Sequence, residues 1–68
     1  MSVARITEIK SSSKISFEDA IKEGLKKTAR TIENLTAAWV GDQEVLVDTN
    51  GNITEYRVLL KVTFIVND

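Results

Sequence analysis

The chain has 68 residues, with 9 basic and 10 acidic side chains, a net charge of −1, and neither cysteine nor histidine. This composition excludes disulfides and thiolate or imidazole metal sites, and the lack of a basic stripe argues against nucleic-acid binding. No apolar run approaches the roughly 20 residues of a membrane-spanning helix, and the N-terminus lacks a signal-peptide core, so we expect a cytoplasmic protein. A single domain over residues 1–68 is small enough that oligomerisation is the expected source of extra stability.

The first predicted element is a strand over residues 3–10. Its apolar residues Val3, Ile6 and Ile9 do not alternate strictly. Either a bulge or a strand buried on both faces would explain this spacing, and the sequence leaves both open. A polar loop over residues 11–15 is expected to follow.

A helix is predicted to begin after Ser16. The Ser16 hydroxyl can accept a hydrogen bond from the backbone N–H of Asp19, and the Asp19 carboxylate can reach back towards Ser16, as in a capping box. Ile15 and Ala20 occupy the positions of a hydrophobic staple. These features together predict where the helix starts.

The helix itself is indicated by apolar residues at i, i+3, i+4 and i+7 spacing, with charged residues on the opposite face. Asn34 is its expected end, because asparagine tolerates the left-handed backbone conformation. Gly24 lies on the apolar stripe at a cost of about 1 kcal/mol relative to alanine, which indicates a packing reason for it. The stripe consists of Phe17, Ala20, Ile21, Gly24, Leu25, Thr28, Ala29 and Ile32.

Two further strands are predicted, over residues 37–48 and from Ile53 onward, joined by a turn with Asn50-Gly51 at its centre. The last strand is long, and one of its faces is wholly apolar from Tyr56 to Val66. The fold class is therefore α+β: a β-α-β-β subunit whose three-stranded antiparallel sheet wraps around one helix. Because one short helix cannot cover so long a strand, we expect the strand to reach past its own subunit.

The sequence offers little for catalysis, and we expect that the protein is not an enzyme. Asp42 and Glu44 share a strand face and could form a carboxylate pair, although solvated strand carboxylates are the commoner case. Residues 48–52 imitate the start of an EF-hand loop. Ile53 and Leu59 occupy the positions where that loop needs glycine and glutamate, so the match fails.

Trp39 is the most informative single residue. It is either a core or interface aromatic or a stacking platform for a planar ligand. On the predicted strand it shares a face with Ala37, Gly41 and Gln43, which are small or polar and leave room beside the ring. Arg57 on the facing strand could lie over a bound ring or hold an anionic group, and a surface ion pair would suit it equally well.

One set of segments covers nearly the whole chain: residues 3–9, 16–21, 29–35 and 55–58, and the last strand through Phe64. In these segments the chain resembles the dodecins. The resemblance implies a hollow homododecamer, with each helix on the concave side of a curved sheet. It also implies that flavins such as riboflavin or FMN are stored in pairs at subunit interfaces, stacked between tryptophans.

The family's binding residues can be carried over only in part. Aligned through residues 40–43, the tryptophan position of the flavin-binding members is Ala37, with Trp39 two residues later, and the glutamine after the tyrosine is Arg57. This pattern is more similar to the dodecin branch without the usual flavin tryptophan, some members of which resemble calcium-binding dodecins.

Three functions follow from this resemblance. The first is flavin storage, with Trp39 stacking on the ring and Arg57 and Gln43 holding polar or phosphate groups. The second is a flavin-free dodecamer that binds a cation such as calcium, or another ligand, for which no metal-binding residue is assigned. The third is a purely structural assembly.

Overall fold

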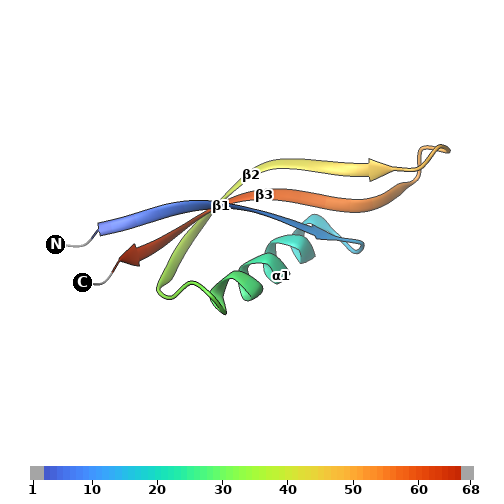
Figure 1. The fold of residues 1–68 in the computed structure, drawn as a ribbon. Helices are drawn as coiled ribbons and strands as arrows, with labels where there is room; N and C mark the ends of the chain where they lie inside the picture. Colours follow the sequence, from blue (N-terminus) through green and yellow to red (C-terminus); the bar gives the residue numbers. More distant parts are fainter. Residues whose placement is uncertain (1–2, 67–68) are drawn as a thin grey trace.

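The structure, a computed structural model, describes residues 3–66. Its elements follow the order β1 (Val3–Ser13), α1 (Phe17–Ala29), β2 (Leu35–Val47) and β3 (Ile53–Val66). The strands form one antiparallel sheet in the order β1-β3-β2, and α1 lies against one face of it (Figure 1). The predicted β-α-β-β fold is confirmed. Within the described residues, α1 is neither long nor apolar enough to cross a membrane.

The pairing of β1 with the central strand β3 is regular from Val3 opposite Val66 to Ser13 opposite Tyr56. Because no bulge interrupts it, the irregular apolar spacing of β1 belongs to a two-sided strand. The pairing also shows that the predicted start of the polar loop, at residue 11, is wrong. The three serines Ser11 to Ser13 extend β1, since their backbone pairs with β3.

Three register shifts interrupt the pairing of β2 with β3, and the one between Val40 and Gln43 lies within the predicted site. Val40 lies opposite Leu60 while Gln43 lies opposite Val58, so Gly41 and Asp42 together oppose a single residue. Such a β-bulge reverses the alternation along the strand. The prediction that Trp39 and Gln43 share a face is therefore wrong.

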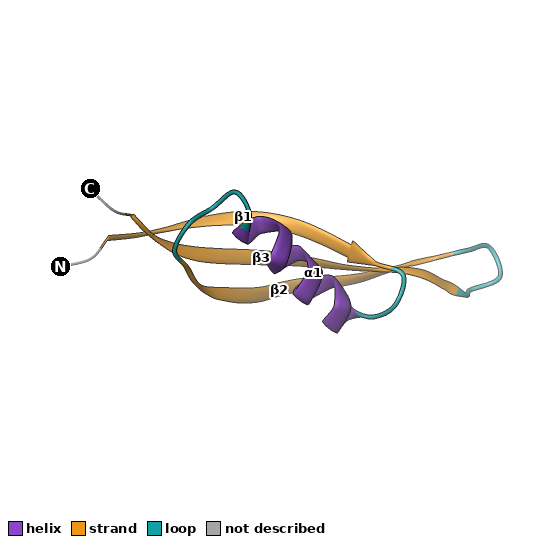
Figure 2. Ribbon diagram, turned by 90° about the horizontal axis from the view of Figure 1, so that it is seen from below, coloured by secondary structure: helices purple, strands orange, loops and turns teal. Residues whose placement is uncertain are grey.

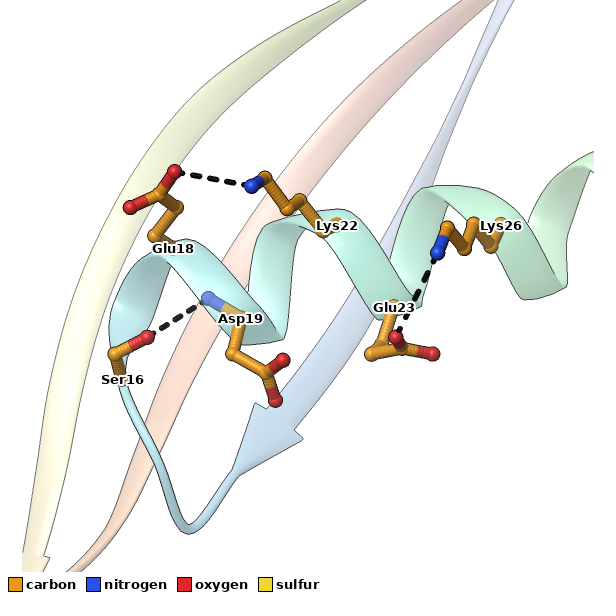
Figure 3. Close-up of polar contacts among 6 residues, drawn as sticks. All are labelled: Ser16, Glu18, Asp19, Lys22, Glu23 and Lys26. Carbon is orange, nitrogen blue, oxygen red and sulfur yellow. Dashed lines mark hydrogen bonds and ion pairs between the residues drawn. The ribbon is translucent and has the colours of Figure 1, made fainter.

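The predicted start of α1 is correct, although its polar contacts differ in part. The Ser16 hydroxyl accepts from the backbone N–H of Asp19 at 2.9 Å, as Figure 3 shows. The Asp19 carboxylate accepts instead from the Ser13 hydroxyl at 2.6 Å, so the reciprocal half of the capping box is not formed. Ile15 is 74% exposed, which rules out the hydrophobic staple.

The predicted end of α1 is wrong by several residues. The helix ends at Ala29, and tighter i→i−3 hydrogen bonds follow, such as that from the Thr31 N–H to the Thr28 carbonyl at 3.1 Å. Asn34 does adopt the left-handed conformation, with φ of 63°, but at the entry to β2. There its carbonyl accepts from the backbone N–H of Ile65 at 3.0 Å, so Asn34 orients the chain for pairing rather than ending the helix.

The core between α1 and the sheet is small. Its buried side chains are Ala20 from the helix and Val58, Leu60 and Val62 from β3. Gly24 has the packing reason that was expected, because a Cβ there would lie 2.7 Å from both Cβ and Oγ of Ser11.

The sheet extends far beyond this core. The described part of the molecule measures 53 × 19 × 14 Å, and the β2–β3 hairpin projects past the end of α1 (Figure 2). The edge-to-face contact between Phe17 and Tyr56, with ring centroids 5.1 Å apart, lies at the N-terminal end of α1. Apolar side chains away from the core stay exposed: Val3, Ile6, Ile15, Trp39, Val40, Val45, Val47, Ile53 and Val66.

Candidate ligand-binding face

The sheet has an inner face, which packs against α1, and an outer face on the other side. In antiparallel pairing, residues directly opposite each other point to the same face. Because Val58, Leu60 and Val62 are buried against the helix, the intervening residues of β3 and their partners make up the outer face. This outer face carries Ile6, Glu8, Lys10 and Ser12 of β1, Ala37, Trp39 and Glu44 of β2, and Arg57, Leu59, Lys61 and Thr63 of β3.

Trp39 lies near the middle of β2 on the outer face, and 73% of its surface is exposed. It is therefore not a core aromatic of this subunit. Ala37 precedes it on the same face, opposite Thr63. Lys61 lies directly opposite Trp39, and Glu8 lies opposite Lys61 on the other side of β3. The indole thus has a small neighbour along its strand, and a basic and an acidic side chain follow it across the sheet.

Two of the predicted site residues lie away from Trp39 within one subunit. Gln43 is opposite Val58 and so points to the inner face. Arg57 is on the outer face, but it is four residues along β3 from Lys61, or about 13 Å at the usual rise per residue. Its guanidinium Nε lies 3.0 Å from Oε2 of Glu55, which is the surface ion pair left open by the sequence.

Arg57 belongs instead to a charged depression on the outer face, beyond the bulge. Its volume is about 150 Å³, and Lys10, Asp42 and Glu44 line it together with Arg57. Asp42 and Glu44 do lie on one face as predicted, with two cationic side chains beside them. Among residues 3–66, no group of three or more acidic, histidine or cysteine side chains is arranged to hold a metal ion.

An apolar hollow of about 270 Å³ opens where the C-terminal end of α1 meets the start of β2. The sequence did not single it out, because its residues come from two separate elements. Of these residues, only Ala37 had been predicted to lie at a ligand site. The hollow is lined by Leu25, Ala29, Leu35, Thr36, Ala37 and Ala38.

Comparisons with known proteins agree with this architecture. Among solved structures, the dodecin of Streptomyces davaonensis superposes with a TM-score of 0.92 at 25% identity, covering 98% of this chain and 97% of that one. A tryptophan-to-phenylalanine variant of the Thermus thermophilus dodecin gives a TM-score of 0.91 at 25% identity, with complete coverage of both chains.

The calcium dodecin of Mycobacterium tuberculosis is also similar. It is 34% identical over 64 residues, which are 94% of this chain and 89% of that protein. Its crystal structure, described as having a novel calcium-binding site, superposes with a TM-score of 0.82 at 29% identity, covering 96% of this chain and 91% of that one. Dodecins are non-catalytic binding proteins, which confirms that this chain is not an enzyme. Since the family model for dodecin also matches residues 3–67, this protein belongs to the dodecin family.

Proposed function

We propose that this protein forms a homododecamer that stores a flavin, riboflavin or FMN, between its subunits. The observation that carries the proposal is the exposed indole of Trp39 on the face of the sheet that α1 does not cover. A tryptophan left 73% exposed in a subunit is well suited to stacking on a planar ring or to burial in an interface. A dodecin is a small-ligand-binding protein, and this face offers an aromatic platform for such a ligand.

The distribution of apolar residues supports the assembly. Four apolar side chains form the buried core, while exposed apolar side chains continue along the sheet to both ends. On the β2–β3 hairpin, Val45, Val47 and Ile53 are 37%, 57% and 51% exposed. Exposed apolar surface on this scale is typical of a subunit that other subunits cover. A shell of identical copies would bury these residues without any further chain.

The proposed site is completed by a second copy. In a twofold interface the same patch of each subunit meets itself, so the indole of one Trp39 would face the partner's Trp39. Ala37 beside it leaves space for a ring system. Arg57 and Gln43 take part in this site only when a neighbouring copy supplies them, because both lie away from Trp39 in their own subunit. Stacking between indoles would exclude water from the flavin and quench its excited state.

The flavin site would differ from that of members with the usual tryptophan, because Ala37 occupies that position and Trp39 lies two residues later. The ring would therefore be displaced by about 6.6 Å along β2. We assign the chain on this ground to the branch of dodecins without the usual flavin tryptophan.

Calcium binding is the second candidate, and the 34% identity to a calcium dodecin favours it. Asp42 and Glu44 are the carboxylates that lie together on the outer face. Carboxylate oxygens suit calcium, but a complete site needs 6–8 oxygen ligands. Two carboxylates in one subunit would therefore have to be supplemented by other subunits or by water. A dodecamer without any ligand is the remaining alternative.

Replacement of Trp39 by alanine tests the flavin proposal. The parent protein is expected to quench the fluorescence of riboflavin and FMN saturably, with one or two flavins bound per pair of subunits. Trp39→Ala should abolish quenching, because stacking on an aromatic contributes about 1–3 kcal/mol per ring in comparable sites. Sedimentation should show that the assembly of the variant is intact.

Lys22→Ala is the control, because it truncates an exposed side chain of α1 on the opposite side of the sheet from Trp39. It should quench as the parent does. Equal flavin binding by Trp39→Ala and the parent would show that the indole is not the platform. A parent that leaves flavin fluorescence unchanged would contradict flavin storage, and calorimetric titration with calcium would then test the second candidate.

A further inference from the structure

We infer that Lys61 determines which planar ligands the Trp39 site accepts, and that it favours a ring system carrying an anionic group. This inference rests on the proposed stacking role of Trp39. It arises from a row of three side chains across the outer face, Glu8, Lys61 and Trp39, which the strand register places directly opposite one another. The order along the row is acid, base, aromatic.

The row is tightly spaced. Neighbouring strands lie about 4.8 Å apart, and the Cβ atoms of directly opposed residues are about 4.5–5.5 Å apart. The ammonium group of Lys61 is therefore the positive charge placed next to the indole by the sheet itself. Arg57 on the same strand is about 13 Å away along β3, so it is too far to serve the same ring in one subunit.

The Lys61 ammonium is also available to a ligand. Lys61 is exposed, and the ion pairs within 4.0 Å among residues 3–66 join other side chains. Glu8 is close enough in the sheet to attract the ammonium but does not hold it. A phosphate or carboxylate attached to a stacked ring would compete with Glu8 for Lys61. Lys61 creates a preference for anionic ligands, and Glu8 consequently weakens that preference.

Riboflavin and FMN are the two probes that separate stacking on Trp39 from attraction of an anion by Lys61. They share the same ring and differ only in the phosphate, so stacking on Trp39 acts on both and Lys61 acts on FMN. The parent is expected to bind FMN more tightly than riboflavin. Lys61→Gln should lower FMN affinity about two- to fivefold, the range of a solvent-exposed ion pair, and leave riboflavin affinity unchanged. Glu8→Gln should raise FMN affinity by a smaller factor.

Lys22→Gln is the matched control. It removes one lysine charge from the exposed side of α1, where Lys22 pairs with Glu18 at 3.2 Å, on the opposite side of the sheet from Trp39. This variant should keep the parent's ratio of FMN to riboflavin affinity. The ratio in the parent should also fall towards one as salt is raised, because salt screens exposed charges.

The outcomes separate the inference from the proposed function. If the parent binds both flavins and Lys61→Gln leaves their affinity ratio unchanged, the specificity role of Lys61 is wrong and flavin storage stands. If Lys61→Gln tightens both flavins equally, the ammonium covers the indole instead of binding a ligand anion, which also overturns the inference. If the parent binds neither flavin, the proposed function fails and the inference fails with it.

Discussion

At the scale of single residues, Gly24 sets how closely α1 approaches β1. A Cβ at this position would lie 2.7 Å from Cβ and Oγ of Ser11, and the Ser11 hydroxyl already donates to the Ala20 carbonyl at 2.7 Å. Gly24→Ala should therefore lower the free energy of unfolding by about 1–3 kcal/mol, despite a gain of about 1 kcal/mol in helix propensity. Denaturant unfolding at fixed protein concentration measures this change.

Lys22→Ala is a control for the same helix, because Lys22 is exposed and its change should stay within about 0.5 kcal/mol. An unfolding free energy for Gly24→Ala at or above that of the parent would show that α1 can move away from β1 without loss. The close approach would then not require glycine.

At the scale of an element, the turn between β2 and β3 depends on the Asp48 carboxylate. Its Oδ1 accepts from the backbone N–H groups of Asn50 and Asn52, at 2.9 and 3.0 Å, while Gly51 adopts a positive φ of 83°. The hydrogen bond from the Asn52 backbone is the largest cause that holds the pKa of Asp48 below its usual value of 3.8. The ionised carboxylate therefore favours the closed turn.

Acid should consequently loosen this turn. Because the pKa of Asp48 is lower in the folded chain than in the unfolded one, its contribution is fully present above pH 3.8 and is lost as the pH falls through the lowered value. The amide NMR shifts of Asn50 and Asn52 should stay constant from neutral pH to about pH 5 and move together at lower pH. Asp48→Asn should remove this joint pH dependence of the two amide shifts. If the shifts of that variant followed the same pH curve as the parent's, the Asp48 carboxylate would not be the group that controls the turn.

At the scale of the whole molecule, the sheet is longer than the helix that covers it. The described part is 53 Å long, whereas the 13 residues of α1 span about 20 Å at 1.5 Å per residue. The uncovered lengths carry apolar side chains at both ends, such as Val3 and Val47, which are 59% and 57% exposed. We therefore expect that the isolated subunit is not stable.

Sedimentation at micromolar concentration should show one species close to twelve times the 7.6 kDa subunit, without folded monomer. Thermal stability should rise with protein concentration, because association stabilises the folded subunit by mass action. A folded monomer under these conditions would contradict both the proposed assembly and the proposed site between subunits.

The elements with local signals could be predicted from the amino-acid sequence. The Ser16 cap, the helical stripe, the turn at Gly51 and the alternation along β3 each depend on residues close in the chain, so they could be predicted without knowing their partners. The sequence left Trp39 as either a core or interface aromatic or a stacking platform, and the structure excludes the core of its own subunit.

How these elements pair with one another depends on contacts between segments that are distant in the chain. The bulge at Gly41 depends on pairing with Leu59, whose carbonyl oxygen would lie 3.0 Å from a Cβ at Gly41, and it turns Gln43 away from Trp39. The same pairing gives Trp39 its neighbour Lys61 instead of Arg57. Strand register is fixed by backbone hydrogen bonds between distant segments and by burial of one face against α1. Alternation within one strand therefore does not predict which residues of the neighbouring strand lie opposite it.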